Sequence, residues 1–207
     1  MTVVASKYAP KKNDLYETEP WAAEALIRAL VQLNLWRNGV IWEPAAGNHA
    51  LARPCLDAGA EAIVTSDIAT YDCQHTFMFD FLTSDEAPLP LKEFDLITNP
   101  PYGRSNRLAV KFAERALERC DGFVALLLTA KFDFGSSRKH LFRDCERFCA
   151  KVALLDRVSW EGNGETGTED HAWYIWGPRT FRAEFPKILY QRNPLKEKVS
   201  GKTVGLV

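Results

Sequence analysis

A hydrophobic run in the middle of the chain, FDLITNPPYGRSNR (residues 94–107), stops at an asparagine, two prolines and a tyrosine. Prolines have a fixed φ and no amide N–H, so they cannot continue a central strand of a sheet. A rigid turn of this kind fixes the direction of the Asn99 amide and of nearby carbonyl groups. Their oxygens could accept both hydrogens of an NH2 group on a flat substrate, with Tyr102 stacked on its face, and so activate a weak amine. The pattern predicts a catalytic site at Asn99, Pro100, Pro101 and Tyr102; an ordinary loop is the alternative.

A second group of small and acidic residues follows other hydrophobic runs. Ala45, Ala46 and Gly47 in WEPAAGNHA predict a tight turn into a helix, where a ligand can approach the backbone. The dinucleotide fingerprint G-x-G-x-x-G is absent. Asp67 follows Glu43 by 24 residues, close to the spacing at which an acidic residue binds ribose hydroxyls. A helix cap is an equally good interpretation of Asp67.

Asp80 and Phe81 form a third candidate pair in FMFDFL. A nucleobase could donate its exocyclic amine to the carboxylate and stack on the ring. The alternative is that Asp80 forms a turn and Phe81 belongs to the core.

Composition limits the class of protein. The 207 residues are 46% hydrophobic, which predicts a single domain over 1–207 with flexible ends at 1–13 and about 193–207. With 26 basic and 27 acidic residues, the net charge of -1 gives no overall positive field, so a nucleic acid would need local basic clusters. No apolar run approaches the length of a membrane span, and no leader segment is apparent. We therefore expect a soluble cytoplasmic protein with no membrane partner.

The five cysteines form no C-x-x-C pair. Their odd number indicates reduced thiols in the cytoplasm, and we expect no disulfide and no metal site. Cys145 and Cys149 should share one face of a helix as core thiols.

Helical and strand patterns alternate along the chain, which is typical of an α/β fold with a mostly parallel sheet and helices on both faces. Ligands bind such sheets outside the carboxyl ends of the strands, where the residues above are expected to gather. Helices are expected over residues 19–34, 49–59, 107–120 and 137–149, and seven strands over 39–44, 61–67, 75–79, 94–99, 122–129, 151–156 and 171–176.

Taken together, these residues resemble the S-adenosylmethionine-dependent amino-methyltransferases that modify adenine N6 in DNA, and most closely the small phage-type enzymes. The family signature (D/N/S)-P-P-(Y/F/W) is matched by Asn99 to Tyr102. The family loop E/D-P-x-x-G-x-G is matched by Glu43, Pro44 and Gly47, whereas His49 replaces its second glycine. The resemblance implies a Rossmann-like class I methyltransferase fold, with a seven-stranded sheet whose last strand is antiparallel.

The resemblance also implies a cofactor site for S-adenosyl-L-methionine and no metal. The family's ribose-binding acid corresponds to Asp67, and its adenine-binding pair to Asp80 and Phe81. Its Y-x-T-P-P segment, which closes over the methionine end, corresponds to YETEP from Tyr16 to Pro20, with Glu19 in place of a proline. The implied cofactor-binding residues are Tyr16, Thr18, Glu43, Pro44, Ala45, Gly47, Asp67, Ile68, Asp80, Phe81 and Asn99.

Several features bear on the substrate. By the family's logic, Asn99 and the Pro100 carbonyl hold the target amine of a flipped or single-stranded base. The chain has no room for a long target-recognition region, so we expect low sequence specificity or a partner that supplies it.

The acidic, glycine-containing segment 157–170 is a candidate lid or a plain connection. The substrate-binding residues expected are Tyr102 and the phosphate contacts Arg104, Arg107 and Lys131. A basic tail from Lys187 to Lys202 is expected to be flexible.

Two alternatives remain open from the sequence. The same N-P-P-Y turn occurs in methyltransferases that act on glutamine in release factors and on guanine N2 in RNA. The second alternative is a catalytically weak module that binds the cofactor poorly. The main feature in its favour is His49 in place of the second glycine.

Overall fold

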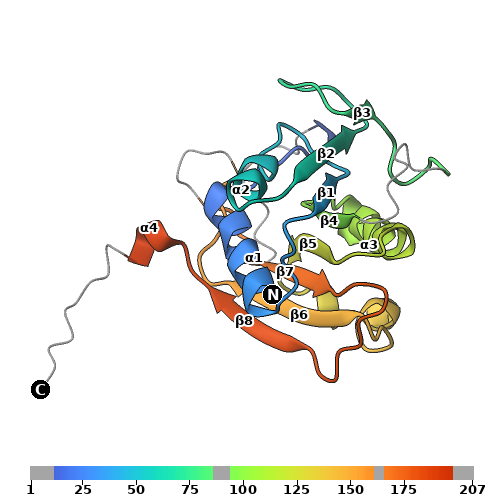
Figure 1. The fold of residues 1–207 in the computed structure, drawn as a ribbon, viewed down its shortest axis with the longest axis vertical. Coiled ribbons are helices and arrows are strands. Elements are labelled where there is room, and N and C mark those ends of the chain that lie inside the picture. Colours follow the sequence, from blue (N-terminus) through green and yellow to red (C-terminus); the bar gives the residue numbers. More distant parts are fainter. Residues whose placement is uncertain (1–11, 86–93, 161–165, 198–207) are drawn as a thin grey trace, which may run out of the picture.

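The computed structural model describes residues 12–85, 94–160 and 166–197. Its centre is an eight-stranded sheet in the order β3-β2-β1-β4-β5-β7-β6-β8, which Figure 1 shows running across the molecule. β7 pairs antiparallel with β5 and β6, and the other pairs are parallel. The strands are β1 (Val40–Glu43), β2 (Ala62–Asp67), β3 (Phe77–Met78), β4 (Asp95–Thr98), β5 (Val124–Thr129), β6 (Phe148–Leu154), β7 (His171–Trp176) and β8 (Lys187–Gln191).

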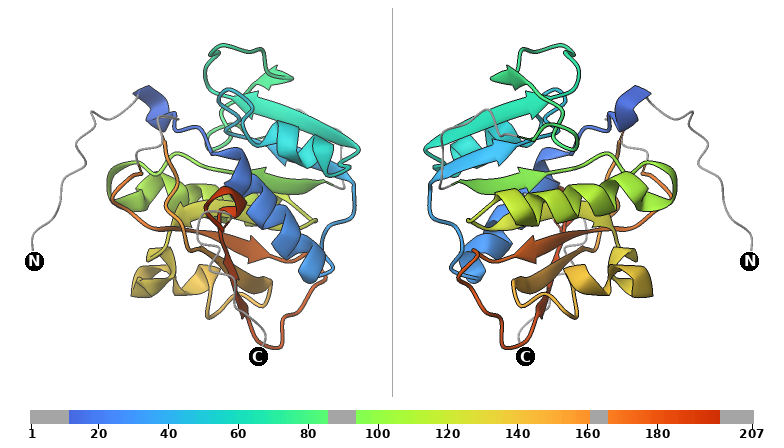
Figure 2. Two further views of the ribbon diagram at one scale, coloured as in Figure 1. Left: turned by 90° about the vertical axis from the view of Figure 1, so that its left-hand side faces the viewer. Right: turned by 90° about the vertical axis from the view of Figure 1, so that its right-hand side faces the viewer.

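Helices cover both faces of this sheet, as expected. α1 (Pro20–Gln32) and α2 (Ala52–Asp57) lie on one face, and α3 (Arg107–Arg119) lies on the other (Figure 2). The inner face of α3 contributes Phe112 and small alanines to the core, while its outer face is charged, as in a helix that covers a sheet from the solvent side. β4 and β5 are almost wholly buried, because helices pack on both of their faces.

The helix expected over 137–149 is wrong. A short 3-10 helix, η4 (Ser136–Leu141), is followed by turns, and β6 already begins at Phe148. Phe142 and Phe148 pack against Tyr174 of β7 in an aromatic cluster, so burial of rings against the sheet overrides the helical spacing. Cys149 therefore lies on a strand, where its thiol donates to the carbonyl of Ile175, and it shares no helix face with Cys145.

The sheet has one strand more than expected, because part of the expected flexible basic tail forms β8. Its residues pair with β6 from Ala150 to Leu154 in parallel register. Of the expected flexible C-terminal end, residues 193–197 are described: Asn193 is buried and α4 (Pro194–Glu197) follows it. Residues 198–207, with Lys198 and Lys202, lie outside the described part of the chain.

Two further expectations concern thiols and membranes. All five cysteines are free thiols. Among the described residues, none of the helices combines the length and apolar character that crossing a bilayer requires.

Candidate functional site

A cavity of about 940 Å³ opens at the carboxyl ends of β1, β2 and β4, where open α/β sheets bind ligands. Its volume lies within the range of small-molecule sites, roughly 300–1,000 Å³. All the residues expected to bind the cofactor line it: Tyr16, Thr18, Glu43, Pro44, Ala45, Gly47, Asp67, Ile68, Asp80, Phe81 and Asn99.

The loop after β1 turns sharply beneath this cavity. Gly47 has a φ of +50°, and a Cβ at this position would lie 2.7 Å from Cδ1 of Leu15, so a side chain fits neither the backbone nor the space. The Gly47 N–H donates a hydrogen bond to the Asp67 carboxylate at 3.0 Å. Tyr71 donates its hydroxyl to the other Asp67 oxygen at 3.5 Å. Asp67 thus fixes the loop while its carboxylate lines the cavity.

Glu43 ends β1 beside Asp67 and is almost fully buried. Burial, and then the nearby Asp67 carboxylate, raise the pKa of Glu43 well above its ordinary value. One oxygen of the Glu43 carboxyl has no hydrogen-bond partner among the described residues. A buried polar atom without a partner is costly, and a ligand that donates a hydrogen bond in the cavity would satisfy it.

Asn99 directly follows β4 and lines the cavity. Its side-chain N–H donates to the carbonyl oxygen of Tyr16 at 3.0 Å. The amide oxygen of Asn99 is therefore the atom that remains to accept hydrogen bonds. A second contact ties the same N-terminal segment to the signature, because the Gly103 N–H donates to the carboxylate of Asp14 at 2.8 Å.

The backbone after the signature is unusual. Gly103, Ser105 and Asn106 have φ values of 62°, 57° and 61°, in the left-handed region that non-glycine residues rarely adopt. Such strained backbone clusters at functional sites, where the surrounding contacts hold it in place. α3 begins directly after it, at Arg107.

Tyr102 differs from the other signature residues in its surroundings. It is half-buried and does not line the cavity, and neither does Pro100, whereas Pro101 does. The Tyr102 hydroxyl donates to the Leu127 carbonyl at 3.1 Å, and its ring stacks near His171 with a centroid distance of 6.1 Å. Burial raises the pKa of Tyr102 above its ordinary value. Stacking of this ring on a substrate remains a prediction.

Asp80 and Phe81 have structural partners in addition to their place on the cavity wall. One Asp80 oxygen accepts the backbone N–H groups of Leu82 and Thr83 at 2.9 and 3.1 Å. The hydrogen bonds from Thr83 lower the pKa of Asp80, so the carboxylate is ionised. Phe81 is buried and stacks on Phe112 of α3 with ring centroids 5.0 Å apart.

The expected phosphate contacts lie outside the cavity. Arg104, Arg107 and Lys131 are exposed, and within the described ranges none of them forms an ion pair. Lys111, one helical turn after Arg107, does line the cavity and was not expected from the sequence. The other cavity residues that the sequence analysis missed include Asp14, Leu15, Asn48 and Tyr71. No local sequence pattern marked these four residues.

His49 lies off the cavity, and the described part of the candidate lid contacts the start of α1. His49 has a φ of 63° and does not line the cavity; its ring contacts His75 instead, and the thiol of Cys73 lies close to both. In the 157–170 segment, the Ser159 N–H donates to the Glu19 carboxylate at 2.7 Å. Residues 161–165 lie outside the described part, so a lid remains a prediction.

The strand order, the antiparallel β7 and the helices on both faces define a Rossmann-like class I methyltransferase fold. A scan against protein-family models gives no match, and neither does a search of curated proteins. Solved structures do match. A "putative RNA methyltransferase" from Pyrococcus horikoshii superposes with a TM-score of 0.62 at 15% identity, over 83% of this chain and 92% of the other.

Two further structures share the fold. The methyltransferase subunit of a type I restriction-modification system from Streptococcus thermophilus gives a TM-score of 0.61 at 11% identity, over 88% of this chain and 48% of that one. A "putative class I S-adenosylmethionine-dependent methyltransferase" from Listeria monocytogenes gives 0.57 at 10% identity, over 82% and 64%. This chain therefore spans about half the length of the Streptococcus subunit.

Proposed function

We propose that the protein transfers a methyl group from S-adenosylmethionine to an exocyclic amine, and that this amine is N6 of adenine in DNA. The observation that carries the proposal is the orientation of Asn99. Its N–H is held by the Tyr16 carbonyl, so its oxygen is the free acceptor at the wall of a cavity of cofactor size. The methyltransferases that share the fold support the transfer of a methyl group.

The residues of the cavity suit this cofactor. Gly47 leaves space where a side chain would collide with Leu15, and the Asp67 carboxylate can accept hydrogen bonds from the ribose hydroxyls. The unsatisfied oxygen of Glu43 is an acceptor for a donor on the ligand. When bound, the cofactor supplies an electrophilic methyl group on a sulfonium centre.

The protein's own task is to orient the amine. The Asn99 oxygen would accept one amine hydrogen and the neighbouring Pro100 carbonyl the other, which would orient the nitrogen lone pair. The cofactor would supply the methyl group, and the methylated amine would then lose one proton to solvent. No residue with a high pKa is needed as a base, because the product ammonium is strongly acidic.

DNA is favoured as the substrate by one of the structural neighbours, whose description names a restriction-modification system. An adenine must leave the base stack to reach a cavity of this kind, or be single-stranded. Arg104, Arg107 and Lys131 are available near the start of α3 and after β5 for phosphate contacts. Sequence specificity on this proposal is low or comes from a partner. His49 lies off the cavity, which argues against the weak-module alternative.

The test is incubation with methyl-labelled S-adenosylmethionine and, separately, duplex DNA, single-stranded DNA, tRNA and a release factor, followed by digestion. We expect label in N6-methyladenine from DNA and its loss in Asn99→Ala. Label in tRNA guanine or in release-factor glutamine would overturn the choice of substrate while leaving methyl transfer intact. Absence of cofactor binding by calorimetry would overturn both.

A further inference from the structure

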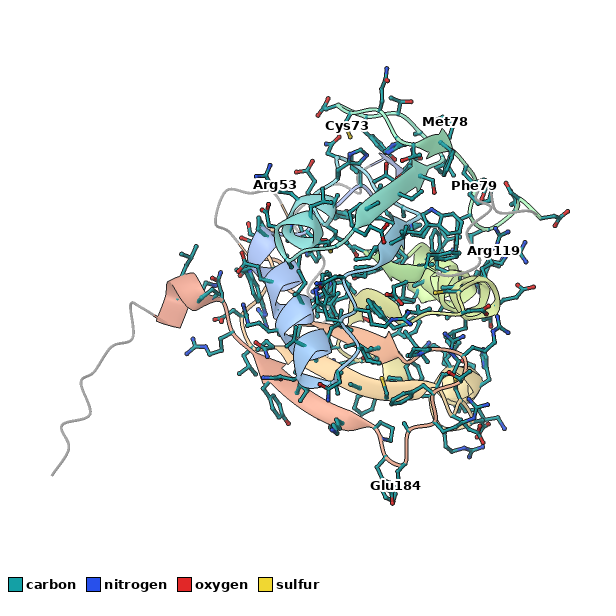
Figure 3. All side chains as sticks on the ribbon, viewed as in Figure 1. Arg53, Cys73, Met78, Phe79, Arg119 and Glu184 are labelled. Carbon is teal, nitrogen blue, oxygen red and sulfur yellow. The ribbon has the colours of Figure 1, made fainter. Side chains whose placement is uncertain are left out.

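Two histidines and a cysteine from different loops meet beside the cofactor loop. His49 follows β1, whereas Cys73 and His75 belong to the connection between β2 and β3. The ligating atoms of all three lie within 4.8 Å of one another, and His49 Nε2 is 3.0 Å from His75 Nδ1. Figure 3 shows Cys73 at the outer edge of the molecule, beyond β2. From this constellation we propose that His49, Cys73 and His75 form a zinc site with a fourth, solvent-accessible position.

The three side chains offer ligand types that zinc binds. Zinc takes histidine nitrogen and cysteine sulfur as ligands, and its sites with three protein ligands keep a fourth position open to water. With bonds of roughly 2.0–2.1 Å to nitrogen and 2.3 Å to sulfur, tetrahedral geometry places neighbouring ligand atoms about 3.3–3.6 Å apart. The 3.0 Å between His49 Nε2 and His75 Nδ1 is slightly short of this range, and Cys73 Sγ lies within 4.8 Å of both nitrogens, so small side-chain rotations complete the shell. All three residues are half-buried, which leaves access for the ion and for a water ligand.

A hydrogen bond behind His75 fixes the tautomer that a metal requires. His75 Nε2 lies 3.0 Å from the carbonyl oxygen of Ala69. Because a carbonyl can only accept, Nε2 carries the proton and Nδ1 presents its lone pair toward His49. Ligating histidines usually donate their second ring N–H to a carbonyl or carboxylate in this way.

The charge around Cys73 also favours a cation. The carboxylates of Asp72, Glu17 and Asp67 lie close enough to act on its thiol electrostatically. The Cys73 thiol donates to the Gly47 carbonyl at 3.4 Å. Zinc would replace the thiol proton, releasing it to solvent, while His49 moves its ring proton from Nε2 to Nδ1. The ion would thus bridge the loop after β1 to the loop before β3.

Sequence spacing conceals this site, because His49 precedes Cys73 by 24 residues and no C-x-x-C is present. No metal site was therefore expected from the sequence. The proposal is independent of the proposed methyl transfer, since it rests on metal ligands alone.

The experiment is titration of the reduced, chelator-treated full chain with Co²⁺ and then Zn²⁺. We expect one Co²⁺ per chain, with a thiolate-to-metal charge-transfer band and the visible bands of tetrahedral Co²⁺, all abolished by Zn²⁺. Zinc in excess should raise the Tm by about 5 °C. Cys73→Ser should remove the charge-transfer band and weaken Co²⁺ binding at least about tenfold.

Cys145→Ser is the matched control, because Cys145 is also a half-buried free thiol but belongs to no His/Cys cluster among the residues that the structure describes. It should leave the spectrum unchanged. The proposal is overturned if the wild-type chain shows no charge-transfer band, or if the band persists in Cys73→Ser. Circular dichroism of the metal-free variants verifies that each one is folded.

Discussion

Asn99 and Tyr16 lie 83 positions apart in the chain, yet the side-chain amide of Asn99 donates a 3.0 Å hydrogen bond to the backbone carbonyl of Tyr16. The residue proposed to hold the target amine is therefore oriented by the segment proposed to close over the cofactor. Because a carbonyl only accepts, this contact decides which atom of the amide is free. A carboxylate at the same position would meet the carbonyl with no proton to share.

The first prediction follows from this contact. Asn99→Asp keeps size and acceptor atoms but loses the donor, so kcat should fall about tenfold, the equivalent of one net hydrogen bond of ~1.4 kcal/mol. Asn38→Asp is the matched control, since Asn38 is exposed before β1, at the opposite edge of the sheet. Initial rates with labelled cofactor measure the effect. Equal rates for the two variants would show that the Tyr16 contact does not orient the site.

The loop after β1 gives a second prediction. Gly47→Ala places a methyl group 2.7 Å from Leu15 at a φ of +50°, so cofactor affinity should fall about tenfold, the equivalent of 1–2 kcal/mol of strain. Gly39→Ala is the control, because a Cβ there has no neighbour within 4 Å. Calorimetry with S-adenosylmethionine compares the two, and undiminished binding by Gly47→Ala would place the cofactor elsewhere.

Tyr102 should act on stability more than on cofactor binding. Tyr102→Phe leaves the Leu127 carbonyl without its donor, which should cost about 1 kcal/mol and lower the Tm by roughly 2–4 °C. Cofactor affinity should not change, since Tyr102 lies off the cavity wall. Tyr190→Phe, on the exposed surface of β8, is the control. A loss of cofactor affinity in Tyr102→Phe contradicts this placement.

The free energy of unfolding should depend on pH through the protonation of His171. Burial lowers its pKa from an ordinary 6.5 to about 4, against the partial opposition of Glu169 and Asp170, and the rings of Tyr102 and Trp160 pack beside it. Between pH 4 and 6.5, the His171 imidazole therefore binds a proton in the unfolded chain but not in the folded chain. The free energy of unfolding should fall by up to about 3 kcal/mol as the pH drops from 6.5 to 4.

Urea unfolding at several pH values measures this slope. His171→Gln should flatten the dependence in that window. His140→Gln should not, because His140 is half exposed and pairs with Glu114. An unchanged slope in His171→Gln would mean that other groups control acid unfolding.

Arginine substitutions test the nucleic-acid contacts. Replacing Arg104 and Arg107 together by Ala should weaken DNA binding and reduce the slope of log K against log salt by about 1–2, since each phosphate contact contributes about 0.7–0.9. Arg182→Ala is the control, because Arg182 pairs with Glu146 and does not line the cavity. Glu184, two residues further on, lies at the lower edge of the molecule in Figure 3. An unchanged salt slope in the double variant would exclude both residues as phosphate contacts.

Local patterns in the sequence were sufficient for most of the fold. The apolar runs of β4 and β5 predict buried strands, and the spacing of the apolar residues in α3 predicts an amphipathic helix. The expectation failed at residues 142–149, where aromatic packing against Tyr174 and Trp176 decides the conformation. It failed again at β8, where the surrounding basic residues indicated a flexible tail, although Ile188, Leu189 and Tyr190 form a short apolar run that pairs with β6.

In the candidate site, too, the features with a local sequence pattern were predictable and the others were not. Residues at strand ends, such as Asp67 and Asn99, were predictable because parallel strands end at one edge. Asp14, Tyr71 and the His49–His75 contact were not, because each depends on loops whose meeting no local spacing encodes.

The bonds that shape the cavity end on main-chain atoms. The Tyr16 carbonyl, the Gly47 N–H and the Gly103 N–H each supply one half of a contact, and a side chain supplies the other half. Every residue except proline offers the same main-chain groups, but the two donors here are glycines at positive φ, where a Cβ would meet Leu15 or Leu108 at under 3 Å. The contact at position 16 therefore requires a carbonyl and no particular side chain, whereas the contacts at 47 and 103 require the absence of one.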